Sequence, residues 1–137
     1  MRVRATLGLT ASAAILSGCA SLAPAICPAG QSAGREVQLF FGRNVGDRVG
    51  VSEADFQSFV DQELTPRFPD GLTVLDAAGQ WRGASGVIGR EPSKVVILML
   101  PDRSGDEDKL AAVRRAYRVR FAQEAVLQTV QPACLRF

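Results

Sequence analysis

Histidine is missing from all 137 positions of the sequence. Histidine is the commonest general base and the commonest metal ligand of proteins, so histidine-based catalytic triads and most zinc sites are excluded. No motif for an activated nucleophile is present either. We therefore expect no cofactor and no metal, and we assign no catalytic residue.

Long apolar runs are also scarce. The N-terminal stretch from residue 5 to residue 16 is apolar or small, but it is shorter than the roughly 20 residues that a membrane-spanning helix needs. Arg2 and Arg4 precede it and small residues follow it. This order is typical of a cleaved signal peptide, which we place at residues 1–18.

Residues 16–19 (LSGC) resemble the lipobox of bacterial lipoproteins. The resemblance implies that the signal peptide is cleaved before Cys19 and that Cys19 is acylated, which would anchor the chain in a lipid bilayer. Ala20 follows the cysteine, and by resemblance to lipoprotein sorting this favours the outer membrane, facing the periplasm. The alternative is an ordinary secretory signal that is cleaved near Ala20 or Ala25.

Excess charge of one sign is the third absence. Removal of Arg2 and Arg4 with the signal peptide lowers the 16 Lys and Arg residues to 14, which equals the 14 Asp and Glu residues. A neutral mature chain has no basic footprint for nucleic acid, so we expect no nucleic-acid partner. The length fits one domain, at residues 36–137, after a tether rich in Ala, Ser, Gly and Pro at residues 19–35.

Cysteine is rare, with three residues in the chain. If Cys19 carries lipid, Cys27 and Cys134 remain as a pair in an oxidising compartment, where thiols usually pair. We predict a Cys27–Cys134 disulfide. Two unpaired thiols are the alternative.

Hydrophobic patterning predicts six elements in the order βαββαβ. Strands are expected at residues 37–43, 72–76, 94–100 and 126–131, the second resuming at residues 80–82 after a kink at residues 77–79. One helix is expected to begin after Ser52, with Asp55 completing a capping box, and to end before Pro66. The other is expected to begin at Asp106.

This order predicts an α+β fold, a ferredoxin-like βαββαβ sandwich. In that fold a four-stranded antiparallel sheet carries two helices on one face, and the first and third strands lie in its middle. The two most apolar strands are the first and the third, which agrees with this placement.

Four segments carry a further resemblance, namely residues 39–42, 65–74, 79–82 and 117–127. Through them the chain is similar to a family of small bacterial exported proteins that is classed as a domain of unknown function. The resemblance covers nearly the whole mature domain. It implies the fold and the location, and it implies no activity, substrate or catalytic residue.

Several polar residues lie next to apolar helix faces or beside the single tryptophan. The charged residues have two interpretations: ion pairs at the edge of the core, which we favour, or the lining of a pocket. Trp81, which donors flank, is interpreted as filling the space under the kinked second strand, and the alternative is that it stacks on a ring or binds a carboxylate. These candidate pocket residues are Glu63, Arg67, Trp81, Arg82, Tyr117, Arg120 and Glu124.

Adjacent strand residues point to opposite faces of a sheet, so one of Phe40 and Phe41 must face away from the helices. Residues 95, 97 and 99 are likewise expected to oppose residues 96, 98 and 100. An apolar second face needs a cover, and we expect a homodimer to supply it. An envelope protein or a small apolar ligand is the other occupant.

The hypothesis that we favour is therefore a binding or interaction module that uses the open sheet face. The alternative is a cofactor-free small-molecule enzyme of the dimeric α/β-barrel type, in which facing sheets enclose a cavity. The basic residues Arg114, Arg115 and Arg118 are interpreted as a solvated helix face, with anionic headgroups as the other possibility.

Overall fold

The structure is a computed structural model that describes residues 26–82, 84–101 and 103–137. The expected signal peptide, Cys19 and the first part of the tether lie outside the described residues. The elements, in chain order, are β1 (Ser32–Gly42), β2 (Asn44–Val45), β3 (Arg48–Val49), α1 (Glu53–Phe59), η1 (Val60–Leu64), β4 (Thr73–Arg82), β5 (Ile88–Pro101), α2 (Asp106–Arg120) and β6 (Leu127–Leu135).

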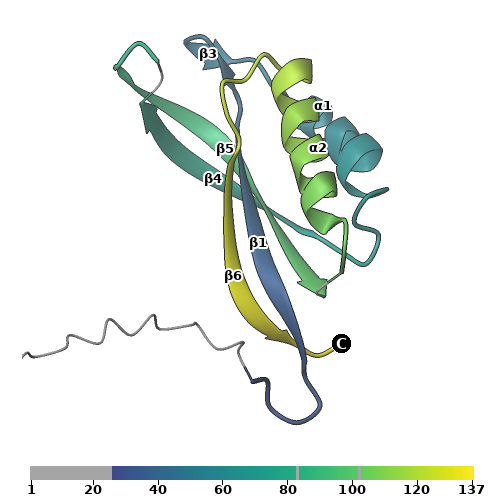
Figure 1. Ribbon diagram of the computed structural model, residues 1–137. Helices are drawn as coiled ribbons and strands as arrows, with labels where there is room; N and C mark the ends of the chain where they lie inside the picture. Colours follow the sequence, from purple (N-terminus) through teal and green to yellow (C-terminus); the bar gives the residue numbers. More distant parts are fainter. Residues whose placement is uncertain (1–25, 83, 102) are drawn as a thin grey trace, which may run out of the picture.

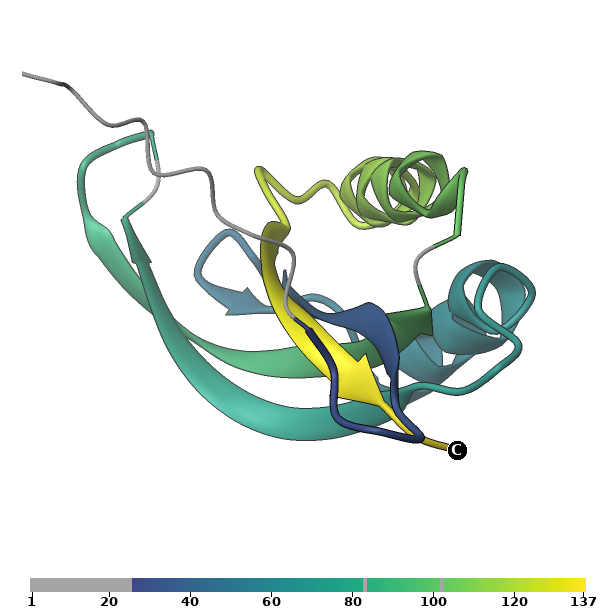
Figure 2. The ribbon, with the colours of Figure 1, turned by 60° about the horizontal axis from the view of Figure 1, so that its bottom comes forward.

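Four strands form an antiparallel sheet in the order β4-β5-β1-β6. The helices lie on one side of this sheet, which is strongly curved (Figures 1 and 2). The predicted α+β class, the four-stranded antiparallel sheet and the two helical segments are confirmed. A short β2-β3 hairpin is added where the sequence predicts only a loop.

The first helix begins where its sequence predicts. The Ser52 side chain accepts a hydrogen bond from the Asp55 backbone N–H, while the Asp55 carboxylate accepts one from the Ser52 backbone N–H. This capping box satisfies two backbone donors that the first turn leaves without partners. The helix continues as the π-helical turn η1 and ends at Leu64, two residues before Pro66.

All four strands of the main sheet are longer than predicted. β6 ends at Leu135, four residues past its predicted end. β4 runs without a break from Thr73 to Arg82, so the predicted kink at residues 77–79 is wrong. β5 begins at Ile88, six residues before the predicted start. β1 begins at Ser32, so the last four residues of the expected tether belong to the sheet, because they pair with the end of β6.

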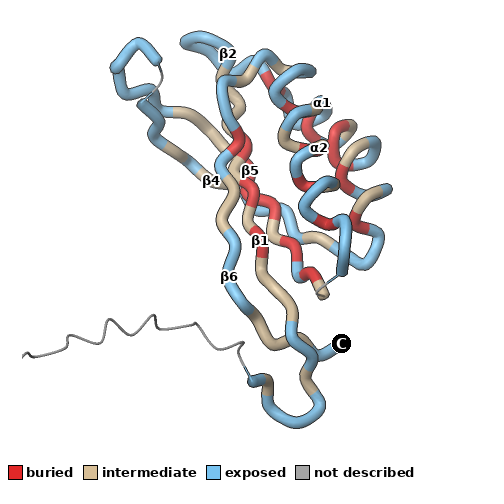
Figure 3. Tube along the Cα trace, viewed as in Figure 1, coloured by how far each residue is buried: buried red, intermediate tan, exposed pale blue. Residues whose placement is uncertain are grey.

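The core lies between the sheet and the helices (Figure 3). β1 contributes Val37, Leu39 and Phe41, and β5 contributes Val96, Leu98 and Leu100 to the same face. Helix positions such as Phe56, Phe59, Leu110, Val113 and Tyr117 pack onto them. The alternation predicted for both central strands is confirmed.

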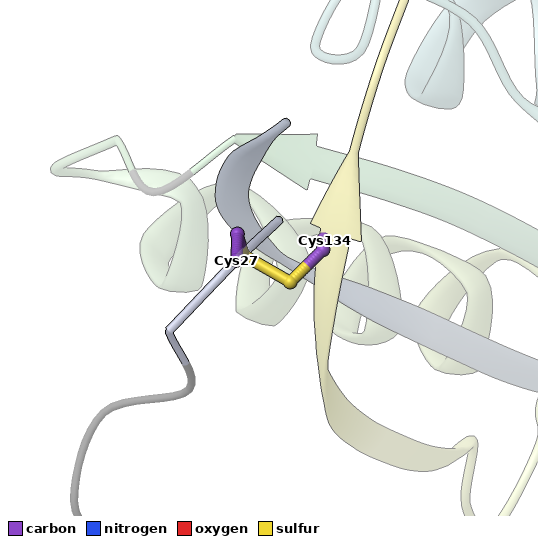
Figure 4. The surroundings of a disulfide bond; sticks show 2 residues. All are labelled: Cys27 and Cys134. Atoms are coloured by element: carbon purple, nitrogen blue, oxygen red, sulfur yellow. A yellow bond between two sulfur atoms is a disulfide. The ribbon is translucent and has the colours of Figure 1, made fainter. Parts of the chain in front are cut away.

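A disulfide joins the two ends of the described chain (Figure 4). The sulfur atoms of Cys27 and Cys134 are 2.10 Å apart, and the two residues are separated by 107 positions in the sequence. Arg136 adds two hydrogen bonds, to the carbonyl oxygens of Ala29 and Gly30. The predicted pairing therefore fixes the segment before β1 to the end of β6.

Candidate functional site

Tyr117 is the one candidate pocket residue at the centre of the core. Its side chain is fully buried, and its hydroxyl donates a hydrogen bond of 2.8 Å to the carbonyl oxygen of Gly42. Burial raises the pKa of the Tyr117 hydroxyl. A neutral, fully buried tyrosine whose hydroxyl is used by the backbone is a structural residue.

The charged candidates on the helices make local contacts. Arg67 Nη1 lies 2.8 Å from Glu63 Oε2, one helical turn away, and it also donates to the Glu63 carbonyl oxygen. Arg120 donates to Gln62 Oε1 and to Ser58 Oγ, which ties α2 to the first helix. Glu63 and Arg67 thus pair as the favoured interpretation expects, whereas the described partners of Arg120 are neutral side chains.

The remaining candidates lie on or near the far end of β4. Trp81 is 49% exposed and Arg82 is also exposed. β4 has no kink and the indole is half-exposed, so the expected packing of Trp81 under a kinked strand is wrong. Glu124 accepts a weak hydrogen bond of 3.4 Å from the backbone N–H of Ala84, in the turn after β4. The structure therefore spreads the seven candidates over the core, the helix surface and the end of the β4-β5 hairpin, and it does not gather them in one place.

Two shallow cavities occur elsewhere. One, of about 340 Å³, lies beside the chain ends and is lined by residues that include Gly30, Pro101 and Arg136. The other, of about 360 Å³, lies on the β4-β5 hairpin and is lined by residues that include Gln80 and Arg90. Neither lining contains any of the seven candidates, so the predicted pocket is not formed by these cavities.

A buried lysine that the sequence analysis did not single out holds the main charge cluster. Lys94 of β5 is 3% exposed and faces the helices, and its ammonium contacts the carboxylates of Glu53 on α1 and Asp76 on β4. Arg43 lies 3.1 Å from the second oxygen of Glu53. The Lys94 ammonium also lies 5.8 Å from the centre of the Phe56 ring. Both carboxylates are mostly exposed, so water solvates the outer side of this cluster.

The Lys94 cluster gives a pH-dependent prediction. The hydrogen bond that Lys94 donates to Asp76 holds the pKa of the Asp76 carboxyl below its usual 3.8, and the hydrogen bonds that Lys94 donates to Asp76 and Glu53 raise the pKa of Lys94 above 10.5. Stability from Asp76 is therefore present above about pH 4 and is lost as the pH falls through its folded pKa. Stability from Lys94 is present below 10.5 and is lost as the pH rises through its folded pKa.

The measurement is a carboxyl NMR titration of Asp76 in the native chain and in Lys94→Met. We expect the low pKa of Asp76 to return towards 3.8 in the variant, because the ammonium has been removed. The Asp55 carboxyl serves as an internal control, since hydrogen bonds from Ser52 are the main cause of its lowered pKa. An unchanged Asp76 pKa would contradict the assignment.

The sheet face opposite the helices carries a continuous apolar row. Cross-strand partners on this face follow the order Leu127, Phe40, Val95 and Leu75, with one residue from each of the four strands. Val95 is only 8% exposed although no helix covers it, because Phe40 and Leu75 flank it on neighbouring strands. This row crosses the sheet from edge to edge.

Two more apolar residues extend the row along β5. Ile97 is half-buried, and Met99 is 40% exposed. Their partners on β1 are polar, since Gln38 pairs with Ile97 and Glu36 with Met99. The face is thus less uniformly apolar than the sequence analysis expected. We call it the open face and define it by its six apolar residues: Phe40, Leu75, Val95, Ile97, Met99 and Leu127.

Within the described residues, no three acidic or cysteine side chains come together in a way that could hold a metal ion. Among the same residues, no helix is both long and apolar enough to cross a membrane.

Comparisons with known proteins add a family and a fold. A family model described as "Protein of unknown function (DUF3574)" matches residues 36–137. A phage SAM lyase solved in complex with S-methyl-5'-thioadenosine is similar with a TM-score of 0.61 and 19% identity, over 82% of this chain and 95% of that chain. The apo state of a phage SAM lyase gives a TM-score of 0.55 and 20% identity, over 79% and 91% of the two chains. The search of curated proteins found no match. At these identities the two structures show a shared fold.

Proposed function

Since the chain belongs to the family described as "Protein of unknown function (DUF3574)", we propose its function from its surfaces: it is an interaction module that associates with a second copy of itself through the open face. The observation that carries this proposal is the apolar row of Leu127, Phe40, Val95 and Leu75. Water is in contact with this row, and burial of apolar surface is the main driving force of association.

We further propose that the domain is a ferredoxin-like sandwich with an added β2-β3 hairpin. Support comes from the strand order β4-β5-β1-β6, which places the first and third strands of the main sheet in its middle. In such a sandwich the helices cover one sheet face only. The other face is then available to a partner along its full width.

The dimensions of the open face suit a second copy. The four strands are 9 to 14 residues long, and at 4.8 Å between strands and 3.3 Å per residue the whole sheet surface on this side, including the far ends of β4 and β5, presents roughly 700 Å². A stable protein interface buries about 800 Å² on each partner. An apolar centre with polar residues such as Gln38 and Glu36 beside it is also the usual anatomy of an interface.

Sedimentation of the chain beginning at Ala20 tests the proposal. This chain has no acyl group, and it keeps every described contact because all of them lie within residues 26–137. We expect a self-associated species at concentrations on the order of 10 µM. A strictly monomeric chain in that range would contradict the proposal.

Charge substitutions then locate the interface. Leu75→Glu and Met99→Glu place a charge on exposed positions of the open face, at 47% and 40% exposure. Each is expected to prevent association, because a desolvated and unpaired carboxylate is costly. Val119→Glu is the matched control, since Val119 is 79% exposed on α2 and should leave association unchanged.

We also propose that the module is a lipoprotein of the bacterial outer membrane, facing the periplasm. The lipobox-like residues 16–19 support this proposal, and so does the Cys27–Cys134 disulfide, which is typical of an oxidising compartment. The test is metabolic labelling with a palmitate analogue. Label that is present in the native chain and absent in Cys19→Ala supports the anchor, whereas label that persists in the variant contradicts it.

A cofactor-free enzyme is the second candidate. The phage SAM lyase solved with S-methyl-5'-thioadenosine has a similar fold, and this is the observation that favours an enzyme. The Lys94 cluster is the set of ionisable groups nearest to acid-base chemistry. S-methyl-5'-thioadenosine is therefore a suitable probe, and the absence of amide NMR shifts at millimolar ligand would argue against this candidate.

A further inference from the structure

Beyond the open face, β4 and β5 continue as a two-stranded arm. β1 pairs with β5 only from Ser93 onwards, so residues 88–92 of β5 and residues 78–82 of β4 have each other as their strand partners. We call these two segments the arm. Figures 1 and 2 show that it extends past the part of the sheet that the helices cover. A two-stranded ribbon is at best marginally stable in water without further support.

The outer side of the arm continues the open face. The pairing of β4 with β5 advances one residue at a time from Thr73 to Arg82, so side chains on β4 alternate without interruption. Leu75 belongs to the open face, and therefore Trp81, six residues further along, points to the same side of the sheet. The two residues mark the two ends of one continuous surface.

The positions next to Trp81 on the outer side of the arm carry no side chain. Its cross-strand partner is Gly89, and the preceding residue on the same side of β4 is Gly79. A Cβ atom placed on Gly89 would find only the Trp81 carbonyl oxygen within 4 Å, at 3.8 Å, which shows how little covers Gly89. Glycine within a strand often marks the close approach of another backbone. The indole is half-exposed in this setting, at 49%.

We propose that the outer side of the arm is part of the same self-association surface, and that Trp81 is its anchor against the second copy. This inference rests on the proposed function and names the residue that contributes most to it. Two arguments select a second copy as the occupant. The outer side of the arm is continuous with the open face. Within the chain, Arg43 and Asn44 donate hydrogen bonds to residues 90–92 at the base of the arm, and Glu124 accepts one from Ala84 in the turn after β4, so a partner would add support along the outer side of the ribbon. Trp is also the residue type most enriched among the strongest contributors to interface affinity.

The chain contains a single tryptophan, so intrinsic fluorescence reports on Trp81 alone. In the chain beginning at Ala20, we expect the emission maximum to move to shorter wavelength and acrylamide quenching to fall as concentration rises. Both changes should share the midpoint measured by sedimentation. Association without a change in Trp81 emission would overturn the role of the arm and leave the open-face proposal standing. No association at all would overturn both.

A variant provides the second readout. Trp81→Ala is expected to weaken association at least about thirtyfold, as measured by sedimentation. Val119→Ala, which removes another exposed apolar side chain on the helical side, should leave association unchanged. At protein concentrations too low for association, the urea midpoint of Trp81→Ala should remain close to that of the native chain, because the Trp81 side chain is half-exposed. Equal association of Trp81→Ala and the native chain would contradict the inference.

Discussion

Phe41→Ala is expected to lower the free energy of unfolding by about 3–5 kcal/mol, which is a large part of the stability of a small domain. Phe41 is fully buried, and the centre of its ring lies 4.7 Å from that of Tyr117, 5.6 Å from that of Phe56 and 5.9 Å from that of Phe59. Truncation would leave a cavity that is surrounded by rigid rings and cannot easily collapse. Urea denaturation followed by far-UV circular dichroism measures the loss.

Phe40→Ala is the matched control for this experiment. Phe40 is the preceding residue of β1, it has the same side chain, and it faces the open face at intermediate burial. At protein concentrations too low for association, we expect Phe40→Ala to lower the free energy of unfolding by about 1 kcal/mol. The loss is smaller than for Phe41→Ala because folding removes less of the Phe40 side chain from water. At higher concentration Phe40→Ala should weaken association, whereas Phe41→Ala should act on folding. Equal losses of stability in the two variants would contradict the assignment of their faces.

Removal of the disulfide has the second largest expected effect. The double variant Cys27→Ser/Cys134→Ser is expected to lose about 2–4 kcal/mol, because the unfolded chain regains the freedom that closure of a long loop removes. The two cysteines are separated by 107 positions, and the chain-entropy model gives about 4.7 kcal/mol for a loop of 100 residues. Urea midpoints of the native and variant chains measure the difference.

A reductant separates the disulfide from the effect of the substitutions. Dithiothreitol should lower the urea midpoint of the native chain and leave that of the double variant unchanged. Alkylation gives an independent check, since Cys27 and Cys134 should react only after reduction. Two cysteines that react in the folded, unreduced chain would show that the bond is absent in solution.

The local parts of the fold could be predicted from the sequence. The capping box of Ser52 and Asp55 depends on residues three positions apart, and it was found where predicted. The opposite orientations of Phe40 and Phe41 follow from strand geometry alone. The disulfide could be predicted because the signal-like N-terminus led to the expectation of an oxidising compartment, in which two remaining cysteines usually pair.

The parts of the fold that depend on contacts between distant segments could not be predicted from the sequence. Arg90, Glu91 and Pro92 show no apolar pattern, and they form a strand only because residues 78–80 of β4 pair with them. Lys94 begins an apolar run, so its burial against Glu53 and Asp76 requires knowledge of where α1 and β4 lie. One feature indicates the burial of Lys94: it is the cross-strand partner of Phe41 and therefore occupies a position that faces the helices.

The candidate pocket was the least predictable part. Glu63 lies beside the apolar stripe of its helix, but Arg67 is one turn away and satisfies it. Trp81 is the single tryptophan of the sequence, and its place on the outer part of the β4-β5 hairpin depends on how far the two strands pair, which the sequence alone does not give.

The bond between Cys27 and Cys134 also determines how the domain resists pulling. Tension that reaches Cys27 from its N-terminal side divides between two routes, through residues 28–31 into β1 and through the sulfur atoms into β6. β1 and β6 are neighbours that pair over nine positions, so both strands share the force and neither is peeled away alone. A pull applied at Cys27 therefore loads β1 and β6 as one unit, and the disulfide prevents either strand from carrying the load by itself.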